Sequence, residues 1–321
     1  MISAAVTDQA FRAAVEAAVR APSLHNTQPW RFRLRDGAID VRADPTRQLR
    51  VADPTGWAVR IACGAAAFNA RLALAVAGSE VRTHLRPDPT DLDLLVRLVP
   101  AGSRPATPAE RHLYDAIPRR HSNRAPFFPE PVPASARASM IEATQAEGAW
   151  LELLIGPGPL AGVAEIAQAA TRVLDRNPDY RAEMTAWTRV DESHGDGVPS
   201  AAGGPSPAPQ DMLPARPFSG RPRGPGRDFE SHPLVAVLGT AADSQRDQLV
   251  AGLALQRVLL TITDSGLAAS MLSQPIEVDS ARERLRIALG RYGAPQMVLR
   301  IGYGQPGFPT PRRGVQDVID E

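Results

Sequence analysis

Residues 22–30 read Pro-Ser-Leu-His-Asn-Thr-Gln-Pro-Trp, a run of hydrogen-bonding side chains held between two prolines. Proline fixes φ and pushes the preceding residue toward extended conformations, so this segment is predicted to be stiff and to hold its polar groups in defined places. We call it the connector, because it joins a predicted helix to a predicted strand. Two interpretations are open at this point: a helix stop with a turn into an edge strand, or one wall of a binding site.

The sequence around the connector has clear periodicity. Apolar residues recur at helical spacing from Thr7 or Asp8 to the residue before Pro22, which predicts an amphipathic helix. Asp36-Gly37 lies between two strand-like runs, over 30–34 and 38–42, and predicts a hairpin. Farther along, the sequence predicts a buried helix over 63–76, a strand over 81–86, and a strand or helical turn over 92–99.

The second half alternates helices and strands again. Helices are predicted over 135–147, over 160–189 with a break at Asn177-Pro178, and over 247–265 and 280–289. Strands are predicted over 150–155, 234–238 and 297–301, and a loop over 268–277.

One long segment, 193–233, loses all periodicity and is rich in Gly, Pro and Ser. A structureless stretch of this length inside a compact chain is usually a functional lid or a linker. Its large side chains, which are Arg216, Phe218, Arg221 and Phe229, favour a lid, since a spacer would not need them.

Two apolar helices are bounded by glycines at the same separation, Gly64 to Gly78 and Gly252 to Gly266. This repetition suggests two similar halves packed about a pseudo-twofold axis, with a shared site where they meet. We assign residues 1–118 to the first half and 119–321 to the second, which includes the 193–233 segment as a lid or insertion.

Composition excludes several classes of function. The 36 basic residues, all arginine, against 35 acidic residues give no sign of a nucleic-acid or membrane-binding surface. Charges interrupt the apolar positions of residues 1–20, which disfavours a signal peptide or a membrane span, and no apolar run of membrane-spanning length is recognised elsewhere. The lone Cys63 rules out an internal disulfide and fits a reducing compartment, so a cytoplasmic location is expected. The six histidines lack the short spacing of a zinc site, and no metal is expected.

Arginines gather at two points far apart in the sequence, at 119–124 and at 312–313. A guanidinium group binds phosphate through two parallel hydrogen bonds, so two such clusters brought together would form a phosphate cradle, to which Ser122 adds a neutral donor. Each arginine taken alone is also compatible with a solvated surface.

Two motifs carry a resemblance to a known family. Arg-His-Ser-Asn-Arg at 120–124 resembles the motif that opens flavin-dependent nitroreductases, and the connector resembles their Pro-Ser-x-x-Asn-x-Gln-Pro-Trp segment. The two motifs occur here in reversed order, and with Gln-Pro-Ile-Glu at 274–277 and the Gly-Tyr-Gly and Thr-Pro-Arg-Arg runs within 302–313 the chain is similar to the Acg subgroup. The resemblance implies an α+β nitroreductase-like fold, two similar halves each with a sheet flanked by helices, packed as an intramolecular pseudo-dimer with one flavin mononucleotide (FMN) site. Such a chain could remain monomeric.

The resemblance also implies roles for single residues. Arg120 and Ser122 would bind the FMN phosphate and ribityl chain, and Arg124 would lie near the N1/O2 edge of the ring system, where reduction builds negative charge. The backbone amide near Glu277 would donate to flavin N5. The full set implied for the cofactor is Pro22, Ser23, Leu24, Asn26, Arg120, His121, Ser122, Arg124, Gln274, Pro275, Ile276, Glu277, Arg312 and Arg313. The chemistry would fall on the flavin, so no side chain is assigned as catalytic.

Two functions of different classes follow. The first is an oxidoreductase that passes hydride from NAD(P)H through flavin N5 to a nitro, quinone or similar small acceptor. The second is a non-catalytic protein that binds and sequesters FMN beneath the lid; a scaffold that has lost its flavin is a third reading. The fused-dimer hypothesis makes one sharp prediction, that Ser23 and Arg120 line one cavity.

Overall fold

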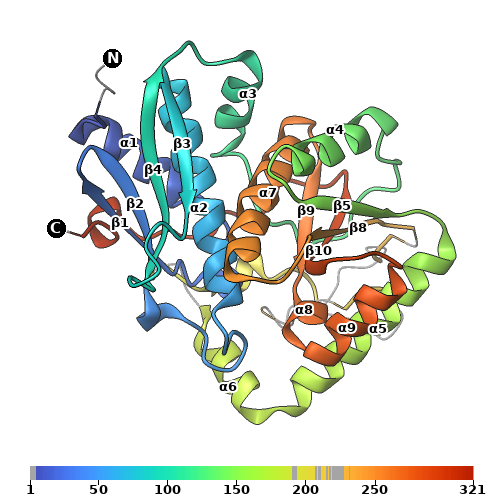
Figure 1. Cartoon of the computed structure of the whole chain (residues 1–321). Helices are drawn as coiled ribbons and strands as arrows, with labels where there is room; N and C mark the ends of the chain where they lie inside the picture. The colour runs from blue at the N-terminus through green and yellow to red at the C-terminus, as the bar shows by residue number, and fades with distance from the viewer. Residues whose placement is uncertain are drawn as a thin grey trace.

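The computed structural model describes residues 5–189, 194–206, 208, 211–214, 216, 218, 228–230 and 232–320. These residues form two α+β halves, each built on a four-stranded antiparallel sheet (Figure 1). Arg221 of the predicted lid lies outside the described residues, as do several of its neighbours.

The first sheet has the strand order β1-β2-β4-β3. Its strands are β1 (Trp30–Arg35), β2 (Ala38–Ala43), β3 (Ser79–Leu85) and β4 (Leu94–Ser103), and its helices are α1 (Asp8–Ala18), α2 (Trp57–Val76) and α3 (Pro108–Ala116). The Asp36-Gly37 hairpin is confirmed, since β1 pairs with β2 from Trp30 opposite Ala43 to Arg35 opposite Ala38.

The second sheet has the order β5-β8-β10-β9. Its strands are β5 (Trp150–Leu154), β8 (Leu234–Thr240), β9 (Ala268–Leu272) and β10 (Ala294–Gly302). The helices of this half are α4 (Ala134–Gln145), α5 (Pro157–Arg176), α6 (Pro178–Ala186), α7 (Gln245–Asp264), α8 (Gln274–Glu277) and α9 (Asp279–Ala288). A short parallel pair, β6 (Thr188–Arg189) and β7 (Val198–Pro199), lies outside the two main sheets.

The two halves repeat one topology. If α1, β1, β2, α2, β3 and β4 are replaced in chain order by α4, β5, β8, α7, β9 and β10, the first strand order becomes the second. The equivalent helices α2 and α7 lie side by side in the centre, between the two sheets (Figure 1). The repetition predicted from the two glycine-bounded helices is therefore confirmed at the level of the fold.

Glycine allows this central contact. A Cβ built on Gly64 would lie 2.4 Å from the carbonyl oxygen of Leu249 and 3.0 Å from the Cα of Gly252. One turn farther along, Gln256 Nε2 donates a hydrogen bond of 2.8 Å to Asn69 Oδ1, in a fully buried amide pair. The backbones of the two helices can thus approach closely, and one buried hydrogen bond joins their side chains, although Gln256 Oε1 has no partner among the described residues.

Both central helices contribute to both hydrophobic cores. Ile61 of α2 and Leu255 of α7 belong to the core under the second sheet, while Phe68 and Leu253 belong to the core under the first. Helix α2 is long and apolar enough to cross a membrane, but 83% of its apolar window is buried inside the protein, as expected for a core helix. Separating the halves would therefore expose apolar surface of each core, which is unfavourable.

Two expectations of secondary structure are wrong. Residues 268–277, predicted to be a loop, form β9 and α8. The β9 sequence Ala-Ala-Ser-Met-Leu has no β-branched residue, and it becomes a strand because it pairs with β10, with Leu272 opposite Val298. Helix α2 also begins earlier than predicted, at Trp57, where the Asp53 carboxylate accepts a 3.0 Å hydrogen bond from Val59 N.

Helix α3 was not predicted at all. Its signal is a capping box in which the side chains of Thr107 and Glu110 each accept from the other's backbone N–H, with Pro108 in the first turn. This signal is present in the sequence, but the short helix lacks a strong apolar period.

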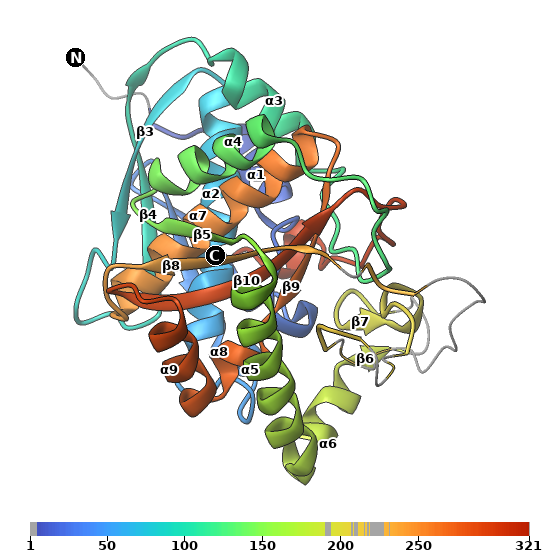
Figure 2. The same ribbon diagram turned by 90° about the vertical axis from the view of Figure 1, so that its right-hand side faces the viewer.

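The second half differs from the first by two insertions. Helices α5, α6 and the 193–233 segment lie between β5 and β8, and α8 and α9 lie between β9 and β10. The first half has only Asp36-Gly37 and residues 86–93 at the corresponding places. Helices α5, α8 and α9 pack together on one side of the second sheet (Figure 2), so the insertions build a wall that the first half does not have.

The last described residues return to the first half. Phe32 N donates to the carbonyl of Val318, and Asp320 N donates to the carbonyl of Phe32, both at 2.8 Å. The end of the chain therefore lies beside β1 (Figure 1). In sequence it belongs to the assigned second half, but in space it packs on the first.

Candidate functional site

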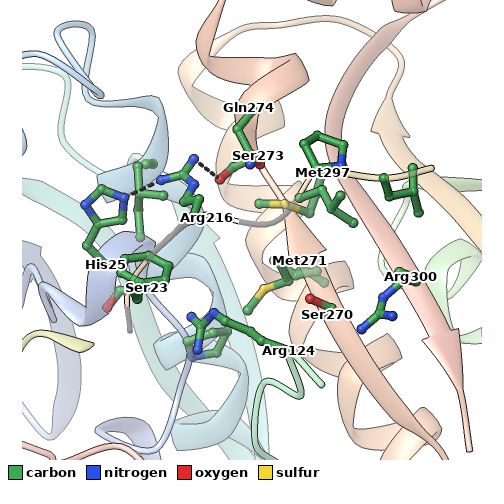
Figure 3. Close-up of a pocket in the computed structure, with 18 of the residues that line it drawn as sticks. Ser23, His25, Arg124, Arg216, Ser270, Met271, Ser273, Gln274, Met297 and Arg300 are labelled. Atoms are coloured by element: carbon green, nitrogen blue, oxygen red, sulfur yellow. Dashed lines mark hydrogen bonds between the residues drawn. The ribbon is translucent and has the colours of Figure 1, made fainter. Parts of the chain in front are cut away.

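A cavity lies where the two halves meet, and we call it the seam cavity (Figure 3). The first half contributes the connector and the start of α2: Pro22, Ser23, Leu24, His25, Trp57, Ala58, Ile61 and Ala62. The second half contributes Arg124, Leu255, the end of β9 with Ser273 and Gln274, and Met297 and Arg300 of β10. Residues Met212, Leu213, Pro214, Arg216 and Phe218 also line it, and we call these five the lid residues.

The connector adopts an unusual backbone. His25, Asn26 and Gln28 have φ values of 50°, 56° and 52°, in the left-handed region that non-glycine residues rarely adopt. Each such residue costs about 1–2 kcal/mol, so the surrounding contacts must hold them there. One contact is local, since Gln28 N donates to Ser23 Oγ at 2.9 Å. This fold of the connector presents His25 to the seam cavity.

The amide side chain of Asn26 joins three segments. Its Nδ2 donates to the carbonyls of Gly197 at 2.8 Å and Pro311 at 3.0 Å, and its Oδ1 accepts from Arg312 Nη1 at 3.0 Å. Gln28 acts in the same way, because its Nε2 donates to Gly195 O at 2.8 Å and its Oε1 accepts from a backbone N–H at the chain end. The connector is thus fixed by Gly195 and Gly197, at the start of the 193–233 segment, and by residues 311–313.

Beside the connector lie two arginines, Arg120, which is buried, and Arg312, which is partly buried. Arg120 Nη2 donates to the carbonyl of Arg20 at 3.1 Å, and Arg312 Nη2 donates to that of Ala21 at 3.4 Å. The Nε atoms of Arg120 and Arg312 have no hydrogen-bond partner among the described residues. Within the same part of the chain, neither side chain forms a salt bridge.

Burial and mutual repulsion perturb this cluster. Burial lowers the pKa of Arg120 to about 10, and burial together with the charges of Arg120 and Arg20 lowers the pKa of Arg312 to about 9. His121 is affected in the same direction, because burial and then the neighbouring arginines lower its pKa. The cluster is therefore a buried positive charge that lacks an anion among the described groups.

Arg124 is a further, partly buried cation, and it lines the seam cavity. Its Nη1 donates to the carbonyl of Ala202 at 3.0 Å, and its guanidinium lies 5.0 Å from the ring centre of Phe218. Burial, followed by the charge of Arg216, lowers its pKa to about 10. A fixed positive charge is thus present at the cavity wall.

Arg216 attaches the lid residues to both halves. It donates to Ser273 Oγ at 2.9 Å, forms a buried ion pair with Glu277, and contacts His25 Nε2 (Figure 3). The other oxygen of Glu277 accepts from the Tyr180 hydroxyl at 3.2 Å. We call the group of Arg216, Glu277 and His25 the latch.

The latch fixes the protonation state of His25. A guanidinium group can only donate, so Nε2 of His25 must be the acceptor and the imidazole proton lies on Nδ1. Burial, and then the charges of Arg216 and Arg124, hold the pKa of His25 well below its ordinary value. His25 is therefore a neutral group in the cavity wall, and it packs edge-on against Phe218 with ring centres 5.6 Å apart.

The predicted site residues fall into three groups. Pro22, Ser23, Leu24, Arg124 and Gln274 line the seam cavity. Asn26 of the connector, and Arg120, His121, Arg312 and Arg313 beside the connector, do not line the seam cavity. Ser122 is paired with Ala269 of β9. Pro275 and Ile276 are buried in α8.

One expectation about a pair of residues needs correction. Ser23 lines the seam cavity but Arg120 does not, because its side chain turns to the backbone of Arg20. The backbone N–H of Glu277 donates to Ser273 O at 3.0 Å inside α8. Its carboxylate binds Arg216.

Sequence reasoning missed His25, Trp57, Ser273 and Arg300 as lining residues. Arg300 had a usable signal, since a single arginine inside the apolar run 297–301 of a buried strand needs a partner. His25 lies within the connector motif, but its side chain faces the seam cavity because of a positive φ, which the sequence does not predict.

The seam cavity is small with the lid residues in place. It encloses about 110 Å³, whereas sites for drug-sized ligands hold about 300–1,000 Å³. A planar three-ring ligand therefore requires lining side chains to move apart. The lid residues, together with Phe229, Glu230 and Pro233, line the cavity from the 193–233 insertion and lie outside regular helices and strands.

The fold and the site define a two-halved α+β protein with a mainly apolar cavity between its halves, into which aromatic and charged side chains also project. No family model matches the sequence. The chain is 35% identical over 328 residues to "Putative NAD(P)H nitroreductase Rv3131" of Mycobacterium tuberculosis (strain ATCC 25618 / H37Rv), covering 97% of this chain and 91% of that protein. It is 28% identical over 332 residues to "Putative NAD(P)H nitroreductase acg" of the same strain, covering 98% and 96%. The chain belongs to the nitroreductase family.

A solved structure, the FMN and NADPH-dependent nitroreductase NfnB from sphigopyxis sp. strain HMH, aligns with 18% identity and a TM-score of 0.42 over 65% of this chain and 98% of that chain.

Proposed function

We propose that the protein binds FMN at the seam between its halves and transfers reducing equivalents from NAD(P)H to a small nitro, quinone or similar acceptor. Membership of the nitroreductase family and the names of the mycobacterial relatives support this proposal. The observation that carries it is the pair of arginines, Arg120 and Arg312, whose buried Nε atoms lack an acceptor among the described residues.

A phosphate group fits the chemistry of this cluster. A buried cation without a counter-ion is unfavourable by several kcal/mol, so an anion that enters the cluster is strongly stabilised. Phosphate accepts two parallel hydrogen bonds from a guanidinium group, and Ser122 supplies a neutral donor in the same motif. Arg312 is tied through Asn26 to the connector, whose residues Ser23 and Leu24 line the seam cavity. A ligand with a phosphate at one end and a planar ring at the other suits this arrangement.

Arg124 supplies a positive charge that would stabilise a reduced flavin. When bound, FMN would provide the two-electron chemistry, and negative charge develops on its pyrimidine edge on reduction. A buried guanidinium with a preorganised position stabilises such charge without reorganising solvent. The lid residues, with Phe218 over Arg124, would exclude water from the same space.

The visible spectrum of the purified protein, recorded before and after added FMN and then NADPH under anaerobic conditions, tests this proposal. We expect a flavin band that survives gel filtration and bleaches with NADPH at a rate sufficient for turnover. A protein that stays colourless after FMN addition would overturn the cofactor assignment. Retained colour without bleaching by NADPH or NADH would overturn the enzymatic part only.

A second function, FMN sequestration without turnover, is favoured by the latch. Arg216 and Glu277 are 9% and 0% exposed, so the lid is held by an ion pair that water barely reaches. A lid held in this way would exclude substrate as well as solvent. Sequestration predicts that removal of the lid increases both flavin release and flavin reduction; if neither rate changes, the lid does not hide the cofactor.

A further inference from the structure

Half of the methionines in the chain line the seam cavity. The sequence has six, and Met212, Met271 and Met297 all line this one space. Met212 belongs to the lid residues, Met271 to β9 and Met297 to β10. We call these three the cavity methionines. The two on strands extend toward the side of the cavity where Ser23 and His25 lie (Figure 3).

The other methionines lie elsewhere. Met140 of α4 is fully buried, and Met184 of α6 is half-buried and packs against the small apolar cluster that contains Tyr180. Met1 lies outside the described residues. Met184 therefore resembles Met212 and Met271 in its exposure but not in its position, which makes it an internal reference for them.

The thioether groups are the side chains at this site that a peroxide would oxidise. Methionine takes up one oxygen atom to become a sulfoxide, in a common oxidative reaction. The sole cysteine of the chain does not compete, because Cys63 is fully buried and is not part of the cavity lining. Burial also raises the pKa of its thiol, so the reactive thiolate is not formed.

Hydrogen peroxide fits the seam cavity with the lid residues in place. The cavity encloses about 110 Å³, whereas about 10–15 Å³ is enough to hold one water molecule. A molecule only slightly larger than water is therefore accommodated where a three-ring ligand requires side chains to move. Peroxide that arises in this space would meet the cavity methionines before it could reach Met184.

Oxidation would change the character of the cavity wall. The lining around the cavity methionines includes the apolar side chains of Trp57, Ile61 and Leu255. A sulfoxide adds a polar acceptor to this wall, and it removes the favourable contact that a thioether makes with an aromatic ring. Because a buried polar group without a partner is unfavourable, a flat ring should bind less tightly to the oxidised cavity.

We propose that the cavity methionines are an oxidation site, at which hydrogen peroxide lowers the affinity of the seam cavity for its ring ligand. The sulfur lone pair attacks one peroxide oxygen and the O–O bond breaks. The other oxygen leaves as water, after a proton moves to it from the oxygen that is transferred. Sulfur is oxidised by two electrons, and the peroxide is reduced.

The source of the peroxide rests on the proposed function. A protein that transfers reducing equivalents produces hydrogen peroxide when dioxygen accepts two electrons and two protons in place of the organic acceptor. The peroxide then arises in the cavity that the methionines line. Oxidation would therefore be coupled to reduction of dioxygen at this site, and it would reduce the affinity for the ring that supports it.

Peptide mass spectrometry of the sulfoxide at each methionine tests the site. The protein is incubated with FMN, NADPH and air, and catalase removes peroxide from the bulk solution. We expect sulfoxide at Met212 and Met271 to exceed that at Met184 by about tenfold, and to be absent without oxygen. Consumption of NADPH with equal oxidation at Met184 and at the cavity methionines would overturn the proposal.

A second measurement uses added hydrogen peroxide and needs no turnover. Fluorescence titration gives the riboflavin affinity before and after peroxide treatment in the wild type, in Met184→Leu and in the triple variant Met212→Leu/Met271→Leu/Met297→Leu. Leucine conserves the volume of methionine, so the triple variant should fold. We expect the wild type and Met184→Leu to lose affinity about tenfold, and the triple variant to lose none.

A wild-type affinity that peroxide leaves unchanged, or an equal loss in all three proteins, would overturn the proposal. Failure of the proposed function gives a different result. If NADPH is not consumed but added peroxide still lowers the affinity of the wild type and not that of the triple variant, the oxidation site stands and the oxidoreductase assignment is wrong.

Discussion

Gly64 of α2 and Gly252 of α7 meet where the two central helices cross, and a Cβ built on Gly252 would lie 2.9 Å from the Cα of Gly64 and 2.2 Å from the carbonyl oxygen of Ile61. The crossing joins the two halves and includes α2, whose first residues line the seam cavity. A methyl group at this point cannot be accommodated without moving a backbone.

The first prediction concerns this crossing. Gly252→Ala should lower the free energy of unfolding by roughly 3 kcal/mol, because overpacking against backbone cannot be relieved by a side-chain rotation. The control is Gly162→Ala in the middle of α5, where a Cβ would meet nothing within 4 Å. The free energy of unfolding of that variant should rise by about 0.5–1 kcal/mol, because alanine has a higher helix propensity than glycine. Urea titration measures the free energy of unfolding of both variants and the wild type. A Gly252→Ala variant as stable as the wild type would contradict the close crossing.

The second prediction separates phosphate from ring recognition. Arg120→Met should weaken FMN binding by about 10–100-fold, the value of one or two charge-assisted hydrogen bonds, and should leave riboflavin affinity unchanged, because riboflavin has no phosphate. Arg119→Met is the matched control, since Arg119 is adjacent in sequence but half exposed. Flavin fluorescence titrations measure the affinities of the wild type and of both variants for FMN and for riboflavin. An equal loss for FMN and riboflavin would show that Arg120 supports the fold and not the phosphate.

The third prediction concerns the latch. The double variant Arg216→Met/Glu277→Gln removes both charges together, so no buried ion is left unpaired. We expect faster release of bound FMN, and faster reduction by NADPH if the lid controls access. Arg284→Ala, which removes an exposed ion pair with Glu165 on the outer face of α9, should change neither rate. Stopped-flow absorbance measures reduction, and identical traces for wild type and double variant would exclude a latch.

The fourth prediction is a pH dependence from Asp53 at the start of α2. Burial raises its pKa to about 6, against the opposing hydrogen bonds from the backbone N–H groups of Val59 and Ala58. The folded state therefore binds this proton more tightly than the unfolded chain, so the stabilisation is present below about pH 4 and is lost as the pH rises through about 6. The lost contribution is about 3 kcal/mol.

Asp53→Asn removes this titration. The difference in unfolding free energy, variant minus wild type, should increase between pH 4 and pH 7 and then become constant. Denaturant titrations at several pH values measure it. Parallel profiles for the two proteins would show that Asp53 titrates normally.

The elements that sequence analysis located correctly carry their signals locally. The β1-β2 hairpin follows from Asp36-Gly37, and the break between α5 and α6 follows from Asn177-Pro178. Strand β9 has no such signal, because its conformation comes from pairing with β10, some thirty residues later in the chain. Local sequence patterns predict local structure, but they do not predict a strand that forms only because a distant strand pairs with it.

The residues of the site fall into the same two groups, those with a local signal in the sequence and those placed by distant contacts. The connector, Arg124 and Gln274 could be placed from motifs, and all contribute to the seam cavity. The contact of Arg216 with His25 joins residues 191 positions apart, and nothing in either neighbourhood specifies the other. The motif predicts a cofactor contact for Asn26, and it carries no signal for the hydrogen bonds by which this side chain joins Gly197 and Pro311.

The left-handed residues of the connector also determine when the site can form. Asn26 and Gln28 are each synthesised 285 residues before a group that holds them, Pro311 and Arg313 respectively. During synthesis the first sheet can assemble while the connector still lacks these contacts, and its strained backbone has little to hold it. The binding wall is therefore completed only after residues 311–313 have been synthesised, so a chain that stops before residue 311 should form much of the scaffold and still have no finished site.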